Sequence, residues 1–346
     1  MKDAILKPKS PFHHGVIFDS SRDGFDSGAA SFGSIFVDED NPDTLYLFYS
    51  GAEETMAHWA IGLAKSRDGF KFERVGKVPI LEGGPAAFCH KEAMAPAVTR
   101  ISNRFYMVFS GKPSSESFRR LGIAYADDPE GSWNIIGELV RPTSLWEGLD
   151  IDNGPSIVNL DKETILVFYS SITSWRWFDI FTILRRYPVR RIGIAKVRIR
   201  GPSMSSIEVY KSPRNPLKHL NGPKGSWNES LFCPGYFKIR DEHCLLPAAS
   251  IYSKGSPYNQ YIGIVKSNSP YFQKATSNIE KLIDGPLEKS LIIPTVKGEI
   301  ALDTPSPLLE DDGETLRIYY AVMDRADGAW KIALSTFKLR VSDERR

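Results

Sequence analysis

The stretch Ile61-Gly62-Leu63-Ala64-Lys65 occurs five times along the chain in closely similar form. The later copies are LGIAY around Gly122, IGIAK around Gly193, IGIVK around Gly263 and KIALS, in which Ala333 takes the place of the glycine. The central residues of successive copies lie 60, 71, 70 and 70 residues apart. A motif that returns at a nearly constant interval indicates that the chain is built from one repeated structural unit.

Two further strand-like runs precede every copy of the motif. The nearer run is rich in β-branched and aromatic residues: TLYLFYSG ending at Gly51, RFYMVFSG at Gly111, TILVFYSS at Ser171, HCLLPAAS at Ser250 and LRIYYAV at Val322. The earlier run carries Pro or Gly before an apolar pair, at Gly33, Pro96, Pro155, Pro234 and Pro307. Turn sequences such as DEDNPDT at 38–44 and DDGE at 311–314 separate the two runs and favour hairpins.

With a weaker fourth run, such as 70–75 or 133–136, each unit forms a four-stranded antiparallel sheet. Five such units predict an all-β fold, a five-bladed β-propeller, as a single domain over 1–346 with blades at about 26–83, 84–145, 146–222, 223–298 and 299–346. The fifth unit lacks an outer strand, and the run at 15–18 is expected to supply it and close the ring. A β-sandwich is the alternative, but it does not account for a fivefold repeat.

The composition excludes several classes of protein. The 346 residues are 42% hydrophobic, which suffices for a large core, and 44 Lys and Arg nearly balance 42 Asp and Glu. This balance lacks the basic excess that nucleic-acid binding requires. No apolar run is long enough for a membrane span, and the first residues lack the pattern of an export signal. Three cysteines without CxxC spacing, Cys89, Cys233 and Cys244, indicate a reducing compartment, so a cytoplasmic location is expected.

The innermost strand of each propeller blade lines a central channel, so a functional site is expected where these strands begin. An acidic residue stands ahead of that strand in every unit: Asp26, Glu92, Asp150 with Asp152, Glu229, and Asp303. A solvent-exposed turn is the ordinary place for one such acid, but five at equivalent places indicate a site, because carboxylates brought together repel. The chemistry that fits is cleavage of a glycosidic bond, in which one carboxyl protonates the leaving oxygen and another activates water or attacks the sugar.

At these places the chain resembles the five-bladed propeller glycosidases of families 43, 32 and 68, which include arabinanases, xylosidases, invertases and levansucrases. FDSGAASFGSI at 25–35 resembles the segment that carries the base or nucleophile, which implies this role for Asp26. DIDNGPSIV at 150–158 is similar to the IDPS motif of family 43 and implies that Asp152 orients the acid and tunes its pKa. WNESLFCP at 227–234 is similar to the segment with the general acid and implies Glu229.

The match departs from the family pattern in blade three. Family 43 has Asp directly before Pro, whereas Asn153 and Gly154 intervene here, so Asp150 and Glu147 remain alternatives to Asp152. An insertion at 174–191, SWRWFDIFTILRRYPVRR, also lies in this blade. It fits a lid, an oligomer contact, an interfacial patch or an extended hairpin packed on a neighbouring blade.

Further side chains near the expected mouth fit sugar binding. The substrate-binding set comprises Glu92, Asp150, Asp303, Trp146, Trp227, His90 and Phe32. The aromatic members can stack on sugar faces, although core packing is the commoner role of Trp. No set of His, Cys and Asp has the spacing of metal ligands, so no metal or other cofactor is predicted. The expected partner is a glycoside or an oligosaccharide.

Two other functions remain open from the sequence. A glycoside phosphorylase resembling family 130 would use phosphate in place of water, held by Lys91, Arg119, Arg120 or the insertion. A propeller that binds sugars without cleaving them is the other alternative. Phosphate dependence of sugar release distinguishes the first, and Glu229→Gln distinguishes the second, because only an enzyme loses turnover.

Overall fold

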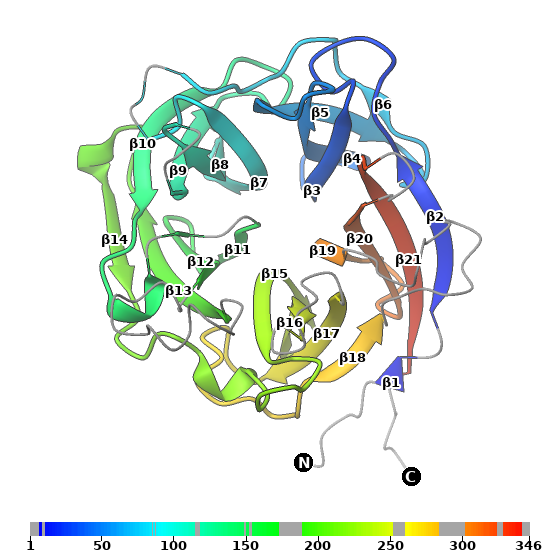
Figure 1. The fold of residues 1–346 in the computed structure, drawn as a ribbon, viewed down its shortest axis with the longest axis vertical. Helices are drawn as coiled ribbons and strands as arrows, with labels where there is room; N and C mark the ends of the chain where they lie inside the picture. Colours follow the sequence, from blue (N-terminus) through cyan, green and yellow to red (C-terminus); the bar gives the residue numbers. More distant parts are fainter. Residues whose placement is uncertain are drawn as a thin grey trace.

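The computed structural model describes residues 7–8, 11–84, 86, 88–114, 118–148, 150–151, 154–172, 189–251, 260–283, 302–323 and 328–340. Their strands form five antiparallel sheets arranged in a ring, as Figure 1 shows. This is the five-bladed propeller that the repeat predicts. Within the described ranges, the helical segments are three 3₁₀ turns, at Leu145–Glu147, Met204–Ser206 and Lys218–Leu220. No helix among these residues is long and apolar enough to cross a membrane.

Each blade is a meander whose first strand lies nearest the centre of the ring and whose fourth is outermost (Figure 1). Blade 1 consists of β3 (Ala29–Asp38), β4 (Asn41–Ala52), β5 (Trp59–Ser66) and β6 (Glu73–Arg74). Blade 2 consists of β7 (Glu92–Ile101), β8 (Arg104–Lys112), β9 (Arg120–Ala126) and β10 (Asn134–Val140). Blade 3 consists of β11 (Ser156–Asn159), β12 (Thr164–Ile172), β13 (Arg190–Ile199) and β14 (Ile207–Lys211). Blade 4 consists of β15 (Ser230–Ile239), β16 (Glu242–Ser250), β17 (Gln260–Ser267) and β18 (Glu280–Ile283).

Blade 5 is assembled from both ends of the chain. Its first three strands are β19 (Leu302–Leu309), β20 (Thr315–Met323) and β21 (Trp330–Arg340), and its outermost strand is β2 (Phe12–Phe18). β2 pairs antiparallel with β21, with Val16 opposite Ala333. The short strand β1 (Lys7–Pro8) continues this pairing at the far end of β21. The expected closure of the ring by an amino-terminal strand is therefore confirmed.

The core consists of five apolar layers, one between each pair of neighbouring blades. Between blades 4 and 5, for example, Leu246 and Ile262 pack against Leu302 and Ile318, and all four side chains are buried. Full burial of one such aliphatic side chain stabilises the fold by about 1.5–3 kcal/mol. The ring is thus held together mainly by contacts between sheets, which leaves its centre free to carry a site.

The glycine of the repeated motif makes room for an aromatic ring from the segment that leads into the blade. A Cβ atom on Gly62, Gly122, Gly193 or Gly263 would collide with the ring of Phe25, Phe88, Trp146 or Trp227, respectively. Glycine inside a strand commonly marks such a close approach. The motif therefore anchors the segment ahead of each inner strand against the third strand of the same blade.

Four of the five inner strands begin with the same irregularity. The register with the second strand shifts between Ser31 and Ser34, and likewise in blades 2, 4 and 5. Within each shift one residue has a left-handed backbone: Phe32 (φ 46°), Ala95 (51°), Cys233 (44°) and Thr304 (44°), while Gly154 (70°) holds the corresponding place before Pro155 in blade 3. Bulges of this kind re-aim side chains and often lie beside functional sites.

Candidate functional site

A narrow cavity of about 90 Å³ runs along the centre of the ring between the five inner strands. All five blades line it with residues at or directly after the bulge, among them Gly33, Pro96, Pro155, Pro234 and Pro305. The inner strands begin at one face of the ring, which we call the entrance face. Their hairpin turns to the second strands lie at the opposite face. The bulges therefore surround the entrance end of the channel.

Two predicted acids lie at the beginning of the inner strands in the neighbouring blades 4 and 5. Asp303 lies at the bulge of β19, next to the channel-lining Thr304, and its Oδ1 accepts hydrogen bonds from the backbone N (2.7 Å) and Oγ1 (3.1 Å) of Thr304. Glu229 precedes β15, is 8% exposed, and its Oε2 accepts a hydrogen bond from the backbone N of Gly225 at 3.0 Å. Such hydrogen bonds orient a carboxylate.

Glu92 and Asp150 meet through Arg119 at the same face. The Oε2 atom of Glu92, the first residue of β7, lies 3.3 Å from Nη2 of Arg119, and its Oε1 lies 3.8 Å from Nζ of Lys112. The backbone N of Arg119 donates to Oδ1 of Asp150 at 2.6 Å, and its carbonyl accepts from Ile151 at 3.2 Å. Arg119 thus joins carboxylates from blades 2 and 3.

Asp26 is directed away from the channel, toward the outer strands. Its side chain is 2% exposed, and its Oδ2 accepts hydrogen bonds from Nε of Arg74 in β6 (2.7 Å) and from the hydroxyl of Tyr49 in β4 (3.0 Å). Its Oδ1 accepts from the hydroxyl of Ser21 at 2.5 Å. The guanidinium of Arg74 also lies over the ring of Phe18, 4.3 Å from its centroid. This geometry does not favour the catalytic role expected for Asp26, which stays a prediction.

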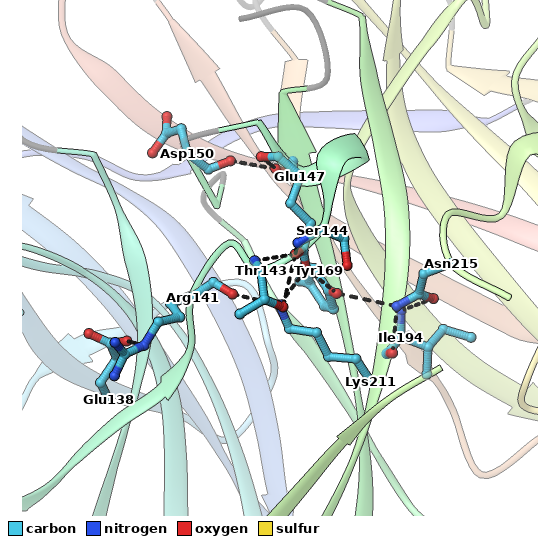
Figure 2. A network of polar contacts seen from close by, with 11 residues as sticks. Glu138, Arg141, Thr143, Ser144, Glu147, Asp150, Tyr169, Ile194, Lys211 and Asn215 are labelled. Carbon is cyan, nitrogen blue, oxygen red and sulfur yellow. Dashed lines mark hydrogen bonds and ion pairs between the residues drawn. The ribbon is translucent and has the colours of Figure 1, made fainter. Parts of the chain in front are cut away.

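Glu147, one of the blade-three alternatives, occupies a matching network in blade 3 (Figure 2). Its Oε1 accepts hydrogen bonds from Nζ of Lys211 (2.6 Å) and from the hydroxyl of Tyr169 (2.8 Å). Its Oε2 accepts from the backbone N of Thr143 (2.7 Å) and Ser144 (2.8 Å). Burial alone would raise the pKa of Glu147, but Lys211, the Thr143 N–H and Tyr169 outweigh it and hold that pKa below its ordinary value. Glu147 is therefore a buried, ionised carboxylate.

The two networks share one design. Tyr49 and Tyr169 stand at the same register, opposite the motif glycines Gly62 and Gly193. In each blade the acid follows the anchored aromatic residue, and its cation comes from the outermost strand. Burial, and then the neighbouring carboxylate, raises the pKa of both tyrosines, so each hydroxyl keeps its proton and donates. The contacts of Asp26 and Glu147 fix the segment ahead of the inner strand to the outermost strand of the same blade.

The predicted aromatic contacts mostly have packing roles. Trp146 lies against Gly193 with its ring centroid 5.7 Å from that of Tyr169. Trp227 lies against Gly263 with its ring 6.0 Å from Tyr261. His90 is exposed, and its Nδ1 lies 3.4 Å from the carbonyl oxygen of Gly84. These positions match the structural alternative for a Trp rather than a sugar platform.

Phe32 does lie at the entrance face, where it packs against two tryptophans that the sequence analysis did not identify. Its buried ring lies 5.5 Å from that of Trp59 and 4.6 Å from that of Trp330, which begin the third strands of blades 1 and 5. Both tryptophans stand three residues before the central residue of the repeated motif. That constant offset is the sequence signal that could have identified them.

The remaining predictions for this face differ in outcome. Asp152 and residues 174–188 of the insertion lie outside the described residues. The residues directly before the bulge Pro or Gly are Phe32, Ala95, Gly154, Cys233 and Thr304, so in these strands no carboxylate takes the place of the family 43 Asp. Asp303, one residue earlier than Thr304, is the nearest. In the described part of the chain, no three His, Cys, Asp or Glu side chains group so as to hold a metal ion.

Residues 34–173 match the family model described as Glycosyl hydrolases family 43. Among similar solved structures, a thermostable family-43 glycoside hydrolase is 15% identical with a TM-score of 0.60 over 94% of this chain and 94% of that one. A family 117 glycoside hydrolase from Zobellia galactanivorans is 14% identical with a TM-score of 0.63 over 97% and 91%. The Cellvibrio cellulosa α-L-arabinanase complexed with arabinohexaose is 13% identical with a TM-score of 0.57 over 90% and 95%. A search of curated protein sequences found no match.

Proposed function

We propose that this protein cleaves glycosidic bonds at the entrance face with a pair of carboxylates. The chain resembles the five-bladed propeller glycosidases, as its sequence predicts, and the family 43 match together with the structural relatives supports a glycosidase. The proposal is supported by acids at the beginning of the inner strand, or in the segment that leads into it, in each of blades 2 to 5: Glu92, Asp150, Glu229 and Asp303. The comparisons favour neither a phosphorylase nor a non-catalytic propeller.

The proposed catalytic pair is Glu229 as the general acid and Asp303 as the base or nucleophile. β15 and β19 pack side by side, so both residues lie at adjacent strands of the ring. Asp303 takes the role that the resemblance implied for Asp26, because it adjoins the channel-lining Thr304, whereas Asp26 contacts the outer strands. Asp152 keeps its expected role of orienting the acid.

In the proposed reaction Glu229 donates its proton to the leaving glycosidic oxygen. The carboxylate of Asp303, oriented by the two hydrogen bonds from Thr304, activates water or attacks the sugar carbon. Proton transfer from a positioned acid contributes about 10²–10⁴ in rate. Because the reaction needs both groups, loss of either carboxyl should reduce turnover by at least about 100-fold.

Substrates to test follow from the relatives and from the resemblance. The names arabinanase and α-L-arabinofuranosidase among the similar structures place aryl α-L-arabinofuranosides and arabino-oligosaccharides first. Aryl xylosides and fructose-containing oligosaccharides form the second set, from the resemblance to xylosidases, invertases and levansucrases. Each substrate is assayed with and without inorganic phosphate, and sugar release that requires phosphate would contradict hydrolysis.

Three variants test the assigned roles. Glu229→Gln and Asp303→Asn should each abolish turnover while the melting temperature stays within about 2 °C of the parent. Glu39→Gln, an exposed acid at the opposite face, serves as the matched control and should retain full turnover. Asp26→Asn should instead lower the melting temperature, with turnover kept by the folded protein. Full activity of Glu229→Gln would refute the acid assignment, and loss of turnover without loss of stability in Asp26→Asn would restore Asp26 as the base.

A further inference from the structure

Every blade has an equivalent residue at its entrance-face end, which we call the rim position. The residue three before the central residue of the repeated motif is Trp59, Arg119, Arg190, Gln260 and Trp330 in blades 1 to 5. Each begins or directly precedes the third strand, at the end of the blade where the inner strand also begins. These five residues therefore form a ring at the entrance face, around the bulges.

Two of these five side chains contact the inner strand of the next blade, and Arg119 contacts the inner strand of its own blade. The ring of Trp330 in blade 5 packs on Phe32 of blade 1. The guanidinium of Arg190 in blade 3 lies 4.8 Å from the ring centroid of Phe232 in blade 4, and its backbone N donates to Oγ of Ser230 at 2.8 Å. These contacts place Trp330, Arg190 and Arg119 beside inner strands that begin at the entrance face.

The rim has two chemically distinct sectors. The aromatic sector comprises Phe32, Trp59 and Trp330, from blades 5 and 1. The cationic sector comprises Lys112, Arg119 and Arg190, from blades 2 and 3. In the cationic sector Lys112 and Arg119 both face the carboxylate of Glu92, and the carboxylate of Asp150 accepts a hydrogen bond from the backbone N of Arg119.

Arg119 has an unused hydrogen-bond donor in this sector. Its Nη2 faces Glu92 at 3.3 Å and its backbone is fixed by Asp150, but its buried Nε has no hydrogen-bond partner within the described part of the chain. A buried N–H without an acceptor costs about 1–3 kcal/mol. An oxyanion placed at this edge would supply the acceptor, and guanidinium groups bind carboxylates and sulfates by this geometry.

We propose that the substrate carries an oxyanion on its sugar, the carboxylate of a uronic acid or a sulfate ester, and that Arg119 is the residue that selects it. Lys112 adds a second positive charge beside the bound group. This inference rests on the proposed function, since it names the class of glycoside that the same face takes. A neutral sugar would leave the Nε donor of Arg119 without a charged acceptor.

The first test measures binding without catalysis. Isothermal titration compares a uronic acid monosaccharide, the corresponding 6-sulfated sugar, the neutral parent sugar and inorganic phosphate. We expect at least one acidic sugar to bind about tenfold more tightly than the neutral sugar or more, with a preference that falls as NaCl rises because exposed charges are screened. Which of the two acidic sugars binds more tightly identifies the source of the oxyanion.

Variants of one side chain locate the effect. Arg119→Gln should remove the preference for the acidic sugar, and Arg119→Lys should keep part of it, because the charge remains while the forked donor is lost. Arg104→Gln is the matched control: Arg104 lies at the opposite end of blade 2, is paired with Asp127 at 2.8 Å, and should not alter the preference. Melting temperatures of the three variants verify that each is folded.

The second test compares kcat/KM for aryl uronides, sulfated aryl glycosides and neutral aryl glycosides. The expected result is a preference for an acidic substrate that Arg119→Gln reduces through KM. Equal affinity for acidic and neutral sugars, or a preference that survives Arg119→Gln, would overturn the inference. Phosphate that competes with the acidic sugar at equal affinity would also overturn it. Cleavage of neutral glycosides alone overturns this inference but not the proposed function, whereas acidic sugar binding without any cleavage supports it and contradicts that function.

Discussion

Replacing the carboxylate of Glu147 by an amide tests whether the Glu147 network is structural. Glu147→Gln keeps the shape of the side chain but removes its charge from five hydrogen-bond donors: Lys211, the hydroxyls of Tyr169 and Thr143, and the backbone N–H groups of Thr143 and Ser144. Because Glu147 is fully buried, the substitution leaves the ammonium of Lys211 without this carboxylate in a low-dielectric setting. The expected loss is in stability, with no loss of intrinsic turnover.

The magnitude follows from the burial of the ion pair. Removing one partner of a buried ion pair costs about 3–5 kcal/mol. With an unfolding entropy of about 2.1 cal/mol/K per residue, the 346 residues correspond to about 0.7 kcal/mol per degree for a single cooperative transition. The melting temperature should therefore fall by about 4–7 °C.

Differential scanning calorimetry at pH 7 measures this shift. The control is Glu163→Gln, whose carboxylate pairs with Arg198 at 3.2 Å on the surface and should change the melting temperature by less than about 1 °C. Adding Lys211→Met to Glu147→Gln should recover part of the loss, because no unpaired cation then remains. A shift in Glu147→Gln no larger than that of the control would refute the structural role.

Three further outcomes follow from described contacts. The folded-state pKa of Glu147 is lowered, so its contribution to stability is present above the ordinary carboxyl pKa of 4.5 and is lost as the pH falls through the lower folded value. The difference in melting temperature between the parent and Glu147→Gln should therefore shrink below about pH 4.5. A difference that stays constant would contradict this. Gly193→Ala should lower the melting temperature by several degrees because the added Cβ meets the ring of Trp146. Gly84→Ala, where the nearest atom is 3.5 Å from the added Cβ, should lower the melting temperature much less. Equal shifts in the two variants would contradict the packing argument. Cys244 is buried and burial raises its pKa to about 12, so a thiol reagent at pH 8 should leave it unlabelled in the native protein and label it in denaturant, as mass spectrometry of the digested protein can verify.

The fold could be predicted from the sequence because its signals are local. The motif around Gly62, Gly122, Gly193 and Gly263 marks each third strand, and the apolar runs before it fix the meander. The ring closure followed from counting strands, since blade 5 had one too few. These features depend on composition and spacing along the chain, and both can be measured without knowing any contact in space.

The direction in which a side chain leaves a loop was harder to predict. Asp26 precedes β3 and Asp303 is the second residue of β19, yet one contacts Arg74 in the outermost strand and the other adjoins the channel. Alignment on the motif glycines would have separated them, because Asp26 follows the anchored ring of Phe25 as Glu147 follows Trp146. The bulge itself could not be predicted, because four of its five left-handed residues are not glycine.

The joint sheet formed by β2 and β21 has a consequence for biosynthesis. The ribosome makes β2 first, but its hydrogen-bonding partner emerges more than three hundred residues later. During translation the nascent chain therefore exposes an unpaired β2 and an open blade 5, and pairing at such a large separation is slow. Deleting the residues before Ser20 should consequently yield a chain that completes four blades, leaves the fifth without its outermost strand, and depends on chaperones to avoid aggregation.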